Sequence, residues 1–134
     1  NLSEAVKDNA RRTFLYNSAR VAVMKGEPEK AEKITMKFLK QVQEIRNTFQ
    51  TWLAHELLGM IYFYKQDYQT ALEEFELSNL QNPYNLYRLA LVWRAMGDSE
   101  KAGKYALQAL NHNTLNSIQY AFVRHKARKL AESL

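Results

Sequence analysis

The sequence predicts an all-α fold in which antiparallel helix pairs repeat along the chain. Three short blocks recur in register, and a small residue lies seven positions before each block. The blocks begin at Gly26, Gln66 and Gly97, the small residues are Ala19, Gly59 and Ala90, and the blocks end at Ala31, Ala71 and Ala102. The small residue and the alanine are 12 residues apart in every copy. Each unit is therefore interpreted as a helical hairpin whose helices meet at small side chains.

Composition agrees with this fold class. The 134 residues are 46% hydrophobic and 25% charged, with only two prolines and four glycines. This balance is typical of a globular chain with long helices. No apolar run approaches the roughly 20 residues that span a bilayer. We expect a single helical-repeat domain over residues 1–134 and no membrane span.

The turns inside the hairpins have recognisable signals. Glycine tolerates the left-handed conformation that often ends a helix, and the acidic residue after it can cap the next helix. Pro28 suits a first helical turn, where its missing N–H is not needed. Asn82 and Pro83 form a strong helix start, and Thr114 is the expected cap of the last helix.

These signals define seven helices in three repeats and a terminal helix. The repeats cover 3–46, 50–81 and 84–112, and the helices are expected at 3–25, 28–46, 50–65, 68–81, 84–96, 99–112 and 115–132. Extra residues around 38–47 predict that the second helix of the first pair is the longest of its kind. The terminal helix is expected to bury one apolar side, formed by Leu115, Ile118, Ala121, Phe122 and Leu130.

Charge and cysteine content leave the compartment open. The net charge is +5, and the chain has no cysteine for a disulfide or a thiolate metal site. Basic residues exceed acidic ones by ten to six in residues 1–50 and by eight to three in residues 84–134. The first residue is Asn1, so we expect a fragment or a mature chain after cleavage. An exported bacterial protein is one alternative for its location.

The repeat pattern resembles the tetratricopeptide repeat family. The middle unit carries Leu58, Gly59, Tyr62, Ala71, Phe75 and Pro83 at the family's spacings. The third unit is looser, since Ala106 takes the phenylalanine position, and the first unit has Thr35 there. The likeness covers about residues 12–114. It implies a right-handed solenoid of helix pairs whose first helices line a concave face, and it implies protein binding.

The resemblance also implies which side chains face a partner. They form an aromatic and arginine-rich groove suited to an extended peptide or an amphipathic helix. These residues are Tyr16, Arg20 and Val23 in the first unit, Glu56, Met60, Phe63 and Tyr64 in the second, and Tyr84, Tyr87, Arg88, Leu91 and Arg94 in the third.

Catalytic and metal-binding motifs are missing from the sequence. His55 and Glu56 begin like a zinc-protease helix, but Gly59 stands where the second histidine ligand belongs. Glu73 and Glu74 are adjacent on a helix expected to be exposed, so they do not form an acid–base pair. We expect no enzyme, no metal and no cofactor.

Two classes of function remain after these exclusions. The first is a module that binds a protein or peptide, with no small-molecule substrate. The second is structural: a capping or oligomerisation segment of a larger repeat protein, with no ligand of its own, and a homo-oligomer stays open. The basic residues of the last helix, Arg124 to Lys129, suit a helix C-terminus better than nucleic acid.

Overall fold

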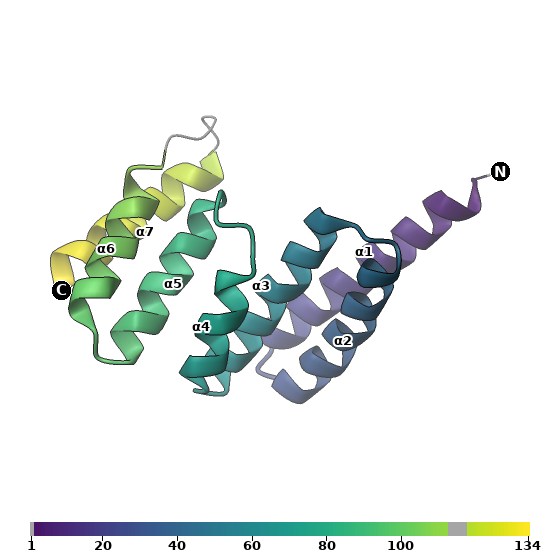
Figure 1. The fold of residues 1–134 in the computed structure, drawn as a ribbon, viewed down its shortest axis with the longest axis horizontal. Helices are drawn as coiled ribbons and strands as arrows, with labels where there is room; N and C mark the ends of the chain where they lie inside the picture. Colours follow the sequence, from purple (N-terminus) through teal and green to yellow (C-terminus); the bar gives the residue numbers. More distant parts are fainter. Residues whose placement is uncertain (1, 113–117) are drawn as a thin grey trace. The chain divides into compact units, whose positions relative to one another are not determined.

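The computed structural model describes residues 2–112 and 118–134, apart from the side chains of 118–120. Within these residues the chain forms helices and no strand (Figure 1). The helices are α1 (Glu4–Met24), α2 (Pro28–Glu44), α3 (Thr48–Tyr64), α4 (Tyr68–Glu76), α5 (Pro83–Ala95), α6 (Ser99–Leu110) and α7 (Ile118–Ser133). The all-α class and the seven expected helices are thereby confirmed in the described part of the chain.

The chain divides into two compact units. Unit 1 (Asn1–Ser78) contains α1 to α4, and unit 2 (Asn79–Leu134) contains α5 to α7. In unit 1, α1 with α2 and α3 with α4 form antiparallel hairpins, and α3 also contacts both helices of the first hairpin (Figure 1). In unit 2, α5 and α6 form a hairpin and α7 packs on both. The expectation of one domain over residues 1–134 stays a prediction.

The predicted left-handed turn residue is present in all three hairpins, and the predicted acidic cap in two of them. Gly26, Gln66 and Gly97 have φ values of 75°, 64° and 85°, in the left-handed region that ends a helix. The side chains of Asp67 and Asp98 cap α4 and α6 by accepting hydrogen bonds from backbone N–H groups. The helix start predicted at 82–83 is also confirmed, because the Asn82 side chain caps α5 and Pro83 is its first residue.

The expected caps at Glu27 and Thr114 are not confirmed. Glu27 precedes α2 but makes no side-chain capping bond, so Pro28 alone provides the start signal there. The predicted cap Thr114 lies outside the described residues.

One helix boundary was predicted wrongly. The fourth helix was expected to reach residue 81, but α4 ends at Glu76. The hydroxyl of buried Ser78 donates to the carbonyl oxygen of Phe75 at 2.6 Å, and a turn follows that leads to the Asn82 cap. A side chain that bonds to the nearby backbone competes with helix continuation. The predicted length of α2 is confirmed, since it has 17 residues against 9 in α4 and 12 in α6.

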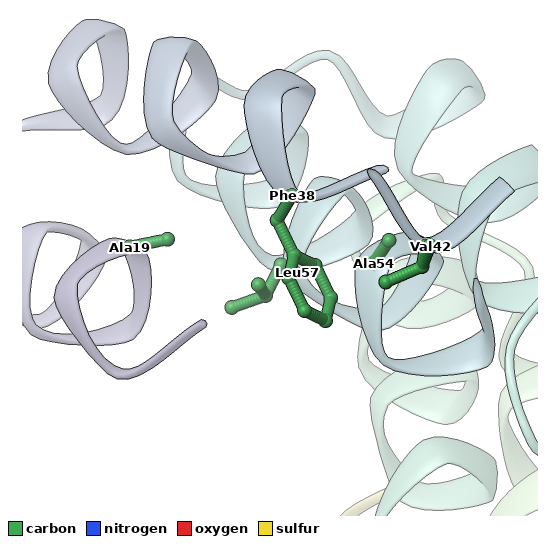
Figure 2. Packing of buried hydrophobic residues seen from close by; sticks show 5 residues of the cluster. All are labelled: Ala19, Phe38, Val42, Ala54 and Leu57. Atoms are coloured by element: carbon green, nitrogen blue, oxygen red, sulfur yellow. The ribbon is translucent and has the colours of Figure 1, made fainter. Parts of the chain in front are cut away.

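The first core of unit 1 joins three helices. Ala19 of α1, Phe38 of α2 and Leu57 of α3 are each at most 1% exposed and form one cluster, completed by Val42 and Ala54 (Figure 2). Thr35 occupies the family's phenylalanine position and satisfies its hydroxyl by donating to the carbonyl oxygen of Ala31 at 2.7 Å. Phe38, one turn later, provides the large side chain that packs against the small Ala19.

In the second hairpin of unit 1, Gly59 of α3 packs against the Phe75 ring of α4. A Cβ atom built on Gly59 would lie 2.5 Å from Cδ1 of Phe75, closer than real Cβ atoms come to a neighbour. The phenylalanine of α4 therefore fills the space that glycine leaves on α3. Ala71, one turn before Phe75, is fully buried, as are Ala31 and Ala102 of the other hairpins. The predicted small-residue positions are all buried.

Unit 2 has an alanine-rich core. Ala90 of α5, Ala106 of α6 and Leu130 of α7 share one cluster, and Leu86, Ala109 and Ala127 form another. Small side chains at these positions allow the helices to approach closely.

The buried side of the last helix differs from the prediction. Val123, Ala127 and Leu130 are buried, whereas Ala121 and Phe122 are exposed, Phe122 by 61%. Leu115 and the Ile118 side chain lie outside the described part. The positions 123, 127 and 130 form a helical stripe of their own, and Ala127 shares a cluster with Ala109 of α6. Of the predicted set, only Leu130 is confirmed as buried.

Candidate partner-binding surface

In unit 1, all seven predicted residues lie on α1 and α3, which contact each other. We call four of them, Tyr16, Arg20, Met60 and Tyr64, the α1–α3 residues. Arg20 is exposed, and Tyr64 is 54% exposed. The Tyr64 hydroxyl lies beside Gly26, where a Cβ atom would approach it to 2.7 Å. The end of α3 therefore places an accessible tyrosine against the turn that follows α1.

The other two α1–α3 residues are partly held by the core. The Tyr16 ring is tilted against Phe38, with 5.9 Å between ring centroids, and Met60 packs on the cluster that contains Val23 and Ile61. Both side chains are half-buried. Tyr16 and Met60 therefore expose only part of their area next to Arg20 and Tyr64.

The side chains of the remaining predicted residues of unit 1 pack inside the unit. Glu56 is only 7% exposed and Val23 only 9% exposed. Phe63 is half-buried against Tyr68, the first residue of α4, with 5.5 Å between ring centroids. These side chains are part of the hairpin interior, so their proposed contact with a partner finds no support in their accessibility.

In unit 2, all five predicted residues lie on α5. The Arg88 guanidinium lies 5.8 Å from the centroid of the Tyr84 ring and donates to Oδ1 of Asn85 at 2.8 Å. Asn85 is fully buried and also donates to the carbonyl oxygen of Asn79 at 3.1 Å. Arg88 is thus held in place by its own helix, with its planar group next to an aromatic face.

The last turns of α5 separate packed from accessible residues. Tyr87 and Leu91 are half-buried against the clusters that Ala127 and Leu130 of α7 complete. Arg94 is exposed in the last turn. Among the predicted residues of unit 2, Arg94 is the one whose side chain is most available to a partner.

The structure reveals a polar network that the sequence did not indicate. The Tyr62 hydroxyl of α3 donates to Oε1 of Glu32 on α2 at 2.6 Å, and Lys65 donates to the other oxygen of the same carboxylate. This arrangement raises the pKa of Tyr62 to about 12, because its proton is shared with an anion. The hydrogen bonds from Lys65 and Tyr62 also hold the pKa of Glu32 below its usual value. The network ties the second hairpin to the first.

A second polar contact corrects an expectation about the outer helices. Glu73 and Glu74 were both expected to be exposed, but only Glu73 is. Glu74 Oε2 lies 2.7 Å from Nδ1 of His55, and both side chains are largely covered, at 21% and 16% exposure. His55 is therefore engaged with α4. In the described part of the chain, no three His, Cys, Asp or Glu residues come together as metal ligands would.

The accessible side chains have a common chemistry. Arginine presents several donors to carboxylates or backbone carbonyls, and tyrosine combines apolar area with a hydroxyl. Such groups hold protein segments by packing and hydrogen bonding. None of the helices in residues 2–112 and 118–134 is long and apolar enough to cross a bilayer.

Comparison with known proteins supports the fold. No protein-family model matches the sequence, and no curated protein matches it. Among solved structures, the chain is similar to the crystal structure of the TPR domain of Arabidopsis FLU, with a TM-score of 0.69 and 18% sequence identity. The match covers 76% of this chain and 93% of that domain. The chain therefore has the fold of a tetratricopeptide-type helical repeat, as its sequence pattern predicted.

Proposed function

We propose that this chain is a protein-interaction module that binds a peptide or helical segment of another protein through the first helices of its hairpins. The observation that carries the proposal is the repeat fold itself. Repeated hairpins present extended surfaces, and proteins of this architecture use them for binding. The similarity to a TPR domain supports the same class of function.

Accessibility refines which side chains make the contact. Arg20 and Tyr64 in unit 1 and Arg94 in unit 2 are exposed, and they are the proposed direct contacts. Tyr16, Met60, Tyr84 and Leu91 are half-buried and support them with apolar area. Arginine and tyrosine are enriched among the residues that dominate binding energy, so a few such side chains are enough for specific recognition.

Photo-crosslinking tests this proposal directly. Benzoylphenylalanine placed at position 20, 64 or 94 of the full chain is expected to give a covalent adduct with one partner protein in the native extract. The same group at the exposed positions 40 on α2 and 73 on α4 provides the controls. Adducts at 40 and 73 with none at 20, 64 and 94 would place the binding surface on the second helices and contradict the proposal.

The outer side of α7 favours a second candidate function. This helix exposes His125, Lys126, Arg128 and Lys129 and buries its apolar stripe. A wettable outer helix is what the end of a repeat stack needs. The chain can therefore serve as the capping or oligomerisation end of a larger repeat protein. Sedimentation over a range of concentrations separates the two functions, since self-association of the isolated chain supports the structural one.

A further inference from the structure

A groove of about 470 Å³ lies between α1 and α2. Its apolar lining includes Phe14, Leu15, Val21 and Ile34. Phe14, in the middle of α1, is 71% exposed, and Val21, in its last turn, is 49% exposed. Large apolar side chains left open along a groove are typical of a docking surface.

The groove is distinct from the surface proposed above. Ala19 and Val23 of α1 are buried in clusters that they share with residues of α3. With 3.6 residues per turn, Phe14 and Val21 lie on the opposite side of α1 from these two residues. Phe14 and Val21 therefore lie on the side of α1 that faces away from α3, whereas the lining residues Leu15, Ala22 and Ile34 also belong to, or pack on, clusters shared with α3. The groove contains none of the α1–α3 residues.

The shape of the groove suits a helix. Ser18 and Ala22, one turn apart on α1, contribute small side chains to its lining. Small residues let a second helix approach the backbone, while Phe14 and Ile34 provide larger walls. The lining on α1 runs from residue 14 to residue 25, which corresponds to about 16 Å of helix or three turns.

Charge identifies one end of the groove. Lys25 and Lys30 both belong to the lining, at the turn between the two helices. Lys30 reaches Glu27 at 3.1 Å, but this pair is exposed, so solvent screens it. None of the lining residues is acidic. A second copy of the chain that docked with this same surface would bring its own lysines to these lysines, and its nearest carboxylate there, Glu27, already pairs with its own Lys30.

We propose that the groove between α1 and α2 binds an amphipathic helix from another protein. The bound helix presents apolar side chains at positions i, i+4 and i+7 toward Leu15, Val21 and Ile34. Acidic side chains in one of its terminal turns lie next to Lys25 and Lys30. Apolar contact provides the affinity, and the two lysines set the direction in which the helix lies.

Designed peptides test the proposal on the full chain. The probes are alanine-rich peptides of about 16 residues, just above the length below which isolated helices are marginal, with leucines at i, i+4 and i+7. Two of them carry glutamates in the first or the last turn, which covers both orientations, and matched peptides carry lysines instead. The expected result is that one acidic peptide binds and shifts the NMR signals of residues 14–34, whereas the lysine peptides bind at least about tenfold more weakly.

Three variants locate and explain the binding. Val21→Glu is expected to weaken the acidic peptide by about tenfold or more, because it places an anion on the apolar wall. Met36→Glu is the matched control, since Met36 of α2 is 51% exposed and lies outside the groove. The double variant Lys25→Glu and Lys30→Glu is expected to reverse the preference toward the lysine peptides.

Several results would overturn the proposal. They are the absence of binding by both acidic peptides, signal shifts confined to residues outside the groove, and a preference that survives the charge reversal. Self-association of the chain that Val21→Glu abolishes would also overturn it, because the occupant would then be a second copy.

Discussion

The hairpin α3–α4 in unit 1 and the hairpin α5–α6 in unit 2 have the same sequence spacing but different packing. In the first, Gly59 makes room for the Phe75 ring, and a Cβ atom would lie 2.5 Å from it. In the second, the equivalent positions are Ala90 and Ala106, which share one cluster. A glycine with a ring and an alanine with an alanine are two ways to bring two helices together. The two hairpins share the sequence spacing of this contact but not the residues that make it.

The two units also differ in their polar contacts between helices. In unit 1, Tyr62 of α3 and Lys65, which directly follows α3, bind Glu32 of α2, and His55 of α3 pairs with Glu74 of α4. In the described part of unit 2, Nζ of Lys101 on α6 lies 4.2 Å from the centroid of the Trp93 ring on α5, and Arg124 of α7 donates to the carbonyl oxygen of His112, which follows α6, at 3.2 Å. Unit 1 thus joins its helices through side-chain carboxylates, whereas these contacts in unit 2 use a cation next to a ring and a bond to the backbone.

The largest expected effect on the free energy of unfolding comes from removing the Phe75 ring. Phe75→Ala leaves a cavity beside Gly59 and is expected to lower the free energy of unfolding by about 3–5 kcal/mol. The equivalent change in unit 2, Ala106→Gly, removes only a methyl group and is expected to lower it by about 1 kcal/mol. Urea titration followed by circular dichroism measures both. Equal effects would show that the two hairpins do not differ in the way described.

The second-largest expected effect on the free energy of unfolding comes from adding a Cβ atom at Gly59. Gly59→Ala is expected to lower the free energy of unfolding by about 1–3 kcal/mol, because its Cβ atom would collide with the Phe75 ring. In a double-mutant cycle, Gly59→Ala and Phe75→Ala are expected to couple favourably by about 0.5 kcal/mol or more, since alanine lacks the Cγ, Cδ1 and Cε1 atoms that the new Cβ would meet. Strict additivity would mean that the ring is not the obstacle.

The Glu32 network predicts a dependence on pH in unit 1. Tyr62 has a pKa of about 12 in the folded chain against an ordinary value of 10.0, so the folded state binds its proton more tightly. The resulting stability is fully present below pH 10 and is lost as the pH rises from about 10 to about 12. Thermal melts across this range are expected to show a steeper fall in wild type than in Tyr62→Phe or Glu32→Gln.

The same carboxylate acts in the opposite direction at low pH. The pKa of Glu32 is lowered by Lys65 and Tyr62, so its contribution is present above the ordinary carboxyl value of 4.5 and disappears as the pH falls through the folded value. Glu32→Gln is expected to reduce this acid sensitivity as well. A variant with unchanged pH profiles at both ends would show that the network does not form in solution.

The smallest expected effect on the free energy of unfolding is the difference between substitutions of the adjacent residues Glu73 and Glu74. Glu74→Gln weakens a largely covered pair with His55 and is expected to lower the free energy of unfolding by about 1 kcal/mol. Glu73→Gln is expected to change it by only a few tenths, because Glu73 is exposed and its partner is Gln69 on the same helix. The difference between the two variants is the informative quantity, and a difference of zero would contradict the pairing.

Local signals in the sequence were sufficient for the helix pairs. Gly26, Gly97, Asp67 and Asp98 act within one turn of their own positions, so their roles follow from nearby residues alone. The end of α4 was missed because it depends on the Ser78 hydroxyl, whose bond to the Phe75 carbonyl has no distinctive pattern. Local rules identify strong turn residues more readily than weak competitors of the helix.

The candidate surface was less predictable, because it depends on contacts between distant positions. Glu32 and Tyr62 are thirty residues apart, and nothing near either residue indicates the other. The packing of α7 covers part of Tyr87 and Leu91, and it uses the stripe that begins at Val123 instead of the one that contains Phe122. Sequence periodicity finds the apolar stripes of a helix but not which of two stripes its neighbours accept.

The affinity of the crosslinked partner segment for variants of the full chain tests the central claim most directly. Isothermal titration is expected to show that Tyr64→Ala and Arg20→Ala each weaken binding by about 2 kcal/mol or more, as truncated anchor residues do. Glu73→Ala and Lys40→Ala, on the second helices, are expected to change it by a few tenths. If Tyr64→Ala and Arg20→Ala bind like wild type while a second-helix variant abolishes binding, the first helices do not form the binding surface.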